Sequence, residues 1–235
     1  MVSLVGPANQ TNQPKHVSSD IVPQGTVPLN AAFSHLPALP DTGDELRDIG
    51  TTMGADLQRD LFLQTRATVC NVKATDLSQY QIVAFATHSL AAGEVVGLDE
   101  PALAMSNPTL VNDTCSNGFL RLDDVLALKL NADWVVLSAC DTGGNNGMGN
   151  EAISGLGRAF FYAGARSLLV SNWAVETVSA RLLTTRLFHA QASRPGMTRA
   201  EALRESMLSL MNTPGTDYGH PAFWAAFSLA GDGAN

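Results

Sequence analysis

The sequence predicts a three-layer α/β sandwich, in which a mainly parallel sheet is covered by helices on both faces. Two short apolar runs, residues 81–89 and 132–140, have the length and the β-branched character of strands buried on both faces. Segments with apolar residues at helical spacing alternate with such strands along the chain. Because this alternation is typical of parallel sheets with helical crossovers, we expect residues 1–235 to form one domain of this class.

Composition bounds the class of protein. The 235 residues are 45% hydrophobic and 15% charged, so the chain can bury a sizeable core without covalent staples. The formal net charge of −8 argues against nucleic acid or an anionic membrane as a partner, because phosphate binding requires a basic patch. No apolar run approaches the roughly 18 residues that span a bilayer, so we expect neither a secretion signal nor a membrane anchor.

The cysteines are Cys70, Cys115 and Cys140. They show no CxxC spacing and their number is odd, so the sequence predicts neither a disulfide framework nor a thiolate metal site. We therefore expect a reducing, cytoplasmic setting, no metal ion and no cofactor.

The amino-terminal part combines one strand, one long loop and one helix. Residues 2–5 are expected to form a strand, and residues 7–37 a long loop with disordered parts. Thr42 and Glu45 have the spacing of a capping box at the start of a helix, which Gly54 ends.

The later elements follow from the same patterns. They are a strand at 61–63, a short helix at 66–74, the strand ending at His88, an inserted hairpin or loop over the sheet within 94–122 with strand pieces at 94–96 and 102–105, a helix at 122–128, the strand ending at Cys140, a helix at 151–163, a strand at 167–171, helices at 176–191 and 199–211, and a strand at 223–230. Thr198 and Glu201 form a second capping box.

Cys140 and His88 are the candidate catalytic pair. Each stands at the carboxyl end of a predicted strand, where open α/β sheets bind their ligands, and a glycine-rich loop follows Cys140. If the two strands are parallel neighbours, their ends lie about 5 Å apart and a thiol faces an imidazole. The separation of the pair is close to the roughly 50 residues found in caspases, where the histidine also comes first. Alternatively, Cys140 is a small buried apolar side chain and His88 bonds a neighbouring carbonyl.

Asp141 and Trp173 are candidates for a substrate pocket. Asp141 either hydrogen-bonds its own loop or lines a pocket for a basic side chain. Trp173 and Trp224 are candidates for the wall of that pocket, although large aromatic side chains near strand ends usually serve packing.

Residues 147–152 match the G-x-G-x-x-A fingerprint of dinucleotide-binding proteins. That fold needs its first glycine directly after the strand, whereas Gly147 follows the Cys140 strand only after a longer loop. The fingerprint therefore offers a nucleotide-binding alternative that the spacing disfavours.

Four ordered segments resemble the CHAT domain, a family related to caspases and separase. They are residues 85–88, 135–143, 159–173 and 220–227. The resemblance implies a caspase-like α/β sandwich and a cysteine endopeptidase whose dyad is His88 and Cys140. By analogy with caspases, it implies that the backbone N–H groups of Ser89 and Cys140 hold the oxyanion. The family usually has glycine where this chain has Ser89, and only glycine enters every backbone conformation freely.

The resemblance also implies partners and a setting. CHAT domains commonly follow helical repeats or other modules in longer bacterial proteins, and they are often latent until a partner acts. We therefore expect a protein substrate, an activating partner or fused module, and no direct contact with nucleic acid or membrane. The alternative is a catalytically silent CHAT-fold module that binds proteins.

Overall fold

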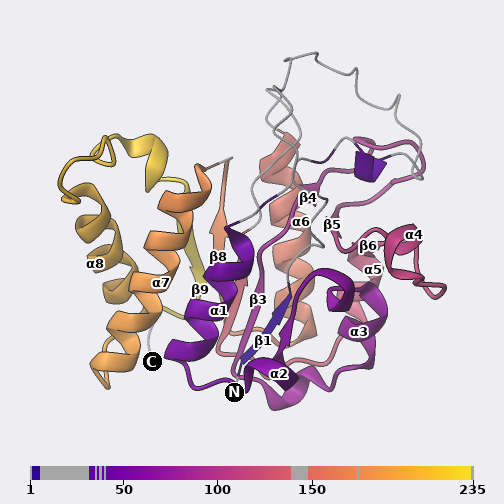
Figure 1. Ribbon diagram of the computed structural model, residues 1–235, viewed down its shortest axis with the longest axis horizontal. Helices are drawn as coiled ribbons and strands as arrows, with labels where there is room; N and C mark the ends of the chain where they lie inside the picture. Colours follow the sequence, from indigo (N-terminus) through magenta and orange to yellow (C-terminus); the bar gives the residue numbers. More distant parts are fainter. Residues whose placement is uncertain are drawn as a thin grey trace.

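The structure is a computed structural model that describes residues 2–5, 32–34, 36, 39, 41–138, 148–173 and 175–233 (Figure 1). A six-stranded sheet with the order β2-β1-β3-β7-β8-β9 runs through its centre. The first five strands in this order are parallel, and β9 is antiparallel to β8. The strands are β1 (Val2–Val5), β2 (Leu61–Phe62), β3 (Ile82–Phe85), β7 (Trp134–Leu137), β8 (Ser167–Ser171) and β9 (Phe227–Gly231).

Helices cover both faces of this sheet, as the three-layer prediction requires (Figure 1). The helices are α1 (Thr42–Thr52), α2 (Leu57–Asp60), α3 (Val69–Ala74), α4 (Pro108–Val111), α5 (Leu122–Leu126), α6 (Met148–Ala163), α7 (Thr177–Ser193) and α8 (Arg199–Met211). Alternate residues of each central strand enter opposite cores. Phe85 and Leu137 join the core under α3, α5 and α6, whereas Ala84 and Val136 join the core under α1, α7 and α8. The predicted fold class is therefore confirmed.

A second, antiparallel sheet is inserted after β3. It consists of β4 (Ser89–Leu90), β5 (Ala102–Ala104) and β6 (Phe119–Arg121) in that order. A third apolar cluster lies against this sheet and includes stacked rings of Phe33 and Phe119, whose centroids are 4.8 Å apart. The insertion was predicted within 94–122, and its strand at 102–105 is confirmed. The predicted strand at 94–96 is wrong, because β5 pairs instead with β4 and β6.

The carboxyl-terminal elements follow the predicted order with one correction. Helix α8 opens on the predicted capping box, in which the Glu201 N–H donates to Thr198 Oγ1 over 3.2 Å. The predicted strand at 223–230 begins later, at Phe227, because a 3₁₀ turn (Pro221–Phe223) precedes it. The His220 imidazole stabilises that turn by accepting the Ala222 N–H over 3.2 Å. The other 3₁₀ turns are Ala32–Ser34, Gln64–Arg66 and Leu77–Gln79.

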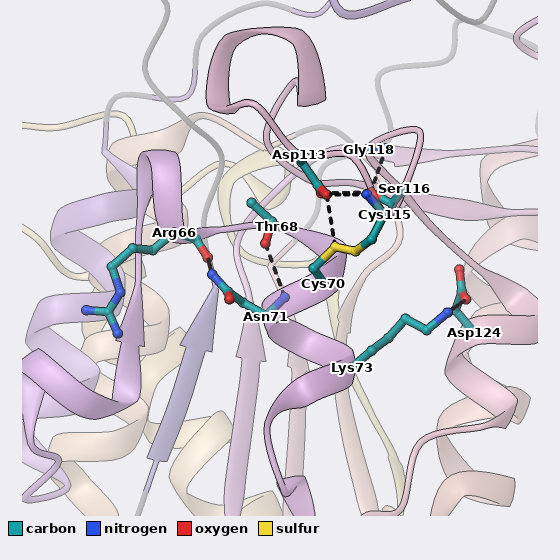
Figure 2. The surroundings of a disulfide bond; sticks show 10 residues. All are labelled: Arg66, Thr68, Cys70, Asn71, Lys73, Asp113, Cys115, Ser116, Gly118 and Asp124. Atoms are coloured by element: carbon teal, nitrogen blue, oxygen red, sulfur yellow. Dashed lines mark hydrogen bonds and ion pairs between the residues drawn. A yellow bond between two sulfur atoms is a disulfide. The ribbon is translucent and has the colours of Figure 1, made fainter.

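Cys70 and Cys115 form a disulfide, which corrects the prediction of no disulfide (Figure 2). Cys70 lies on α3 and Cys115 lies between α4 and β6, and their Cα atoms are 6.2 Å apart. The sequence pattern did not predict this bond, because the two cysteines are 45 residues apart and no local spacing indicates their pairing. The bond ties the helical layer of α3 to the inserted sheet.

Within the described ranges, no helix has both the length and the apolar character needed to cross a membrane.

Candidate active site

Three neighbouring strands of the main sheet end at one edge, in register with one another. Phe85 of β3 lies opposite Leu137 of β7, and Leu137 lies opposite Val170 of β8. The register continues one residue further, because the Ser138 N–H donates to the Phe85 carbonyl over 2.9 Å. The strands that precede His88 and Cys140 are therefore parallel neighbours, which is the condition on which the predicted pair depends.

His88 follows Phe85 by three residues and is held between the two sheets. Its side chain is buried, with 3% of the residue exposed. The His88 carbonyl accepts the Ala104 N–H of β5 over 2.8 Å, and the preceding hydroxyl of Thr87 donates to the Ala104 carbonyl. We call residues 86–90 the His88 segment. Its backbone is held by hydrogen bonds to β5.

Ser89 is the first residue of β4 and lies opposite Leu103 of β5. It is buried, with 3% exposed. Among the described residues other than glycine, only Gln64 and Asn112 have a positive φ, so Ser89 has a backbone conformation that any residue adopts. Serine in place of the usual glycine therefore creates no backbone strain here.

Cys140 and Asp141, two of the predicted site residues, lie outside the described residues. Trp173 is described: it follows Val170 by three residues, at the same edge of the sheet. The residue is 41% exposed, and its Nε1–H donates to the Ala222 carbonyl over 3.3 Å. Trp224 does not share this position with Trp173, because it lines an apolar groove of about 450 Å³ along α8.

Glu45 carries a buried carboxyl beneath this edge. Its spacing from Thr42 predicts a capping box. That prediction is wrong, because Asp41 precedes α1 as its N-cap residue and the Thr42 hydroxyl donates to the Leu39 carbonyl over 2.8 Å. The Glu45 side chain turns inward instead and accepts the Thr184 hydroxyl of α7 over 2.8 Å.

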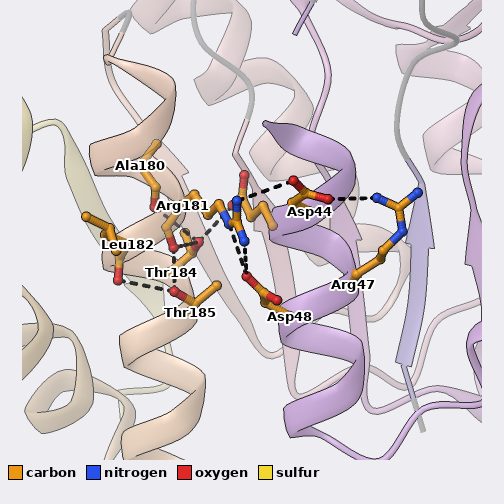
Figure 3. Close-up of polar contacts among 9 residues, drawn as sticks. Asp44, Arg47, Asp48, Ala180, Arg181, Leu182, Thr184 and Thr185 are labelled. Carbon is orange, nitrogen blue, oxygen red and sulfur yellow. Dashed lines mark hydrogen bonds and ion pairs between the residues drawn. The ribbon is translucent and has the colours of Figure 1, made fainter. Parts of the chain in front are cut away.

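Burial governs the charge of Glu45. Desolvation raises the pKa of its carboxyl to about 7. Hydrogen bonds from Thr184 and Ser138 and the nearby Arg181 guanidinium act in the opposite direction and lower this pKa, but their effect is smaller. Figure 3 shows Arg181 of α7 reaching across to Asp44 and Asp48 of α1. Its guanidinium nitrogens lie 3.4 Å from the Asp44 carboxylate and 2.7 Å from the Asp48 carboxylate. The Glu45 carboxyl thus contacts Ser138, which precedes the predicted nucleophile Cys140 by two residues in the sequence.

Parts of two further candidate sites, one for a metal ion and one for a nucleotide, lie among the described residues. Cys70, Asp113 and Cys115 are the one group of three potential metal ligands found there, with their ligand atoms within 4.8 Å of one another. In the disulfide state the two sulfurs are bonded to each other and are not thiolate ligands. For the nucleotide fingerprint, Gly147 lies outside the described residues, and Gly149 already lies inside α6 rather than in a phosphate-binding turn.

A mainly parallel sheet between two helical layers, with a buried histidine beyond the carboxyl end of a central strand, is the architecture of the caspase-like α/β domains. The chain belongs to the CHAT domain family, whose sequence profile matches residues 5–232. It is also similar to tetratricopeptide repeat protein 28 of human, at 31% identity over 112 residues, and of mouse, at 29% identity over 112 residues. Each match covers 48% of this chain and 4% of the relative.

Proposed function

We propose that the protein is a cysteine endopeptidase of the caspase type, with His88 and Cys140 as its catalytic dyad. The register at the sheet edge carries the proposal. Phe85 and Leu137 are paired across neighbouring strands, and His88 and Cys140 each follow their paired residue by three positions. Neighbouring strands are about 4.8 Å apart. Two residues of extended chain span at most about 7 Å, so the chain from Ser138 limits Cys140 to a position close to this edge of the sheet.

The proposed reaction follows from the chemistry of the two side chains. The Cys140 thiol transfers its proton to the His88 imidazole, and the sulfur attacks the carbonyl carbon of a peptide bond. The C–N bond then breaks while His88 gives the proton to the leaving amine, which leaves an acyl group on the sulfur. Water, deprotonated by His88, hydrolyses this thioester and returns the thiol. Backbone N–H groups of Ser89 and Cys140 stabilise the oxyanion of both tetrahedral intermediates.

Burial of His88 supports this role. A neutral imidazole in a dry site becomes a cation at a cost, and a neighbouring thiolate offsets that cost. The hydrogen bonds of Ala104 and Thr87 hold the His88 backbone, so the orientation of the ring is limited to side-chain rotation. Positioning of this kind is what proton transfer over hydrogen-bond distance requires.

We further propose that Asp141 and Trp173 form the pocket for the residue before the cleaved bond, and that this residue is basic. Trp173 supports the pocket, because it occupies the position after β8 that corresponds to His88 after β3. An exposed indole face binds cations favourably, which fits an arginine or lysine side chain beside a carboxylate.

The proposed substrate is a protein, and the proposed regulation is activation by a partner or a fused module. The relatives support this, since both are named as tetratricopeptide repeat proteins, and such repeats are helical modules. The match covers only 4% of those proteins, so the presence of a fused module beside this domain belongs to the proposal as well.

The dyad is tested by the rate of Cys140 alkylation with iodoacetamide between pH 5 and 10, read by mass spectrometry. The parent is expected to titrate at least about one unit below the free-thiol pKa of about 8.5, and His88→Ala is expected to return to that value. His189→Ala, which changes an exposed histidine of α7, is the matched control and keeps the parental profile. A Cys140 that titrates like a free thiol in the parent contradicts the dyad and favours the silent protein-binding module.

A further inference from the structure

The Cys70–Cys115 disulfide is open to exchange. Figure 2 shows the bond between Cys70 of α3 and Cys115. Cys70 is half-buried and Cys115 is exposed, so a small thiol reagent can reach the sulfur pair from solvent. In the dithiol state the Cys70 Sγ–H has a partner in place, because the Asp113 carboxylate lies 2.9 Å from this sulfur. Both redox states therefore have a hydrogen-bonded arrangement at this site.

A chain of hydrogen bonds leads from Cys115 to β5. The Cys115 N–H donates to the Asp113 carboxylate over 3.0 Å, and the Ser116 hydroxyl donates to the same group over 2.9 Å. Ser116 in turn accepts the Gly118 N–H over 3.2 Å. The Gly118 carbonyl accepts the Met105 N–H over 2.8 Å, which brings the chain of bonds next to Ala104.

Residues 104–106 connect both ends of the disulfide to the His88 segment. The Ala104 N–H donates to the His88 carbonyl over 2.8 Å. Two residues later, the Ser106 N–H donates to the Ala67 carbonyl over 2.8 Å, and Ala67 precedes Cys70 by three residues. The disulfide thus closes a ring of covalent and hydrogen bonds through residues 67–70, 105–106 and 115–118. Ala104, the neighbour of Met105 in this ring, bonds the His88 segment.

We propose that Cys70 and Cys115 are a redox-modification site whose oxidation holds the His88 segment in place and whose reduction loosens it. The effect on catalysis rests on the proposed function of His88, whereas the effect on the segment does not. Cross-linking restricts the open states of the stretch between Cys70 and Cys115, which are 45 positions apart, so reduction makes local opening of β5 more frequent. The disulfide state is therefore the one in which His88 is positioned for proton transfer.

The reaction is a thiol–disulfide exchange with a low-molecular-weight dithiol. A dithiol thiolate attacks one sulfur, which breaks the Cys70–Cys115 bond and forms a mixed disulfide. The second dithiol sulfur then displaces the protein sulfur and closes its own S–S bond. The two hydrogens of the dithiol end on Cys70 and Cys115, so two electrons move from reagent to protein. The cyclic disulfide product reverses both steps.

The test measures amide hydrogen exchange by NMR in the full chain carrying Cys140→Ser, so that only the pair can react. One sample contains dithiothreitol and the other contains its cyclic oxidised form. Alkylation verifies the redox state, with two free thiols expected in the first sample and none in the second. The Ala104, Met105 and Ser106 amides are expected to exchange about tenfold faster in the reduced sample. Leu183 and Leu187 of α7, on the other face of the sheet, serve as reference amides with equal rates in both samples.

A second variant separates the cross-link from side effects of the reagent. Cys115→Ser in the same background is expected to show the fast exchange in both buffers. Equal slow exchange of the three amides in the two redox states overturns the proposal, as does a buffer response that persists in Cys115→Ser. The main comparison changes neither Cys70 nor Cys115, so it stands even if Cys115→Ser folds poorly. Because neither measurement uses Cys140 or a substrate, absence of peptidase activity leaves this test unaffected.

Discussion

A peptidyl acyloxymethyl ketone that ends in arginine is expected to modify Cys140, and to do so about 10²–10⁴-fold more slowly in His88→Ala. The probe places an electrophilic carbon where a peptide carbonyl would lie, so its reaction needs the same thiolate and the same oxyanion donors. Loss of the imidazole removes proton transfer and the ion-pair partner of the sulfur together. The rate is measured by intact mass against time, with peptide mapping to locate the adduct.

Three variants make this result specific. His189→Ala removes an exposed histidine on α7 and should keep the parental rate. Cys140→Ala should give no adduct at this position, and labelling elsewhere at the parental rate would refute the assignment of the nucleophile. Asp141→Asn should cut the preference for an arginine probe over a glutamate probe. An unchanged preference in Asp141→Asn would mean that another group recognises the basic side chain.

The central sheet was predictable because burial on both faces leaves a strong local signature. β3 and β7 are short runs of apolar residues that the structure buries completely, and the glycine or polar residues after them mark their ends. The patterns left their adjacency open, and the pairing of Phe85 with Leu137 establishes it. The strand pieces of the inserted sheet were harder, since β4 has only two residues and depends on its partner β5.

Contacts between distant segments were not predictable in the same way. The spacing of Glu45 from Thr42 fits a cap, but Glu45 also lies four residues before the buried Ile49 and so on the same face of α1. Its partner Thr184 is far away in sequence, and no local pattern connects the two. The Cys70–Cys115 pair has the same origin, because an odd number of cysteines with long spacings permits a bond without indicating it.

Glu45→Gln is expected to stabilise the protein above pH 7 by up to about 3 kcal/mol, with almost no effect near pH 4.5. The Glu45 carboxyl has an ordinary pKa of 4.5 in the unfolded chain and a pKa of about 7 in the folded chain, because burial disfavours its charge. Between these values the folded chain holds a proton that the unfolded chain has released. The free energy of unfolding contributed by Glu45 therefore falls as the pH rises through this window.

Glutamine tests this mechanism closely, because its amide oxygen still accepts the Thr184 hydroxyl while the charge is lost. The measurement is the free energy of unfolding in urea of parent and variant from pH 4 to 9. The difference between the two free energies is plotted against pH. Asp217→Asn, which removes an exposed carboxyl, is the control for the loss of one negative charge. Parallel curves for parent and Glu45→Gln would show that Glu45 does not titrate in this range.

The same titration bears on the candidate site, because Ser138 connects Glu45 to the loop of Cys140. When Glu45 loses its proton, a negative charge develops at the point where β7 ends, with Arg181 as the cation that lowers its energy and Asp41 as a second anion that raises it. A thiolate nearby is disfavoured by that charge. Glu45→Gln should therefore speed Cys140 alkylation above pH 7 and leave it unchanged near pH 5. A uniform change at all pH values would indicate altered packing rather than charge.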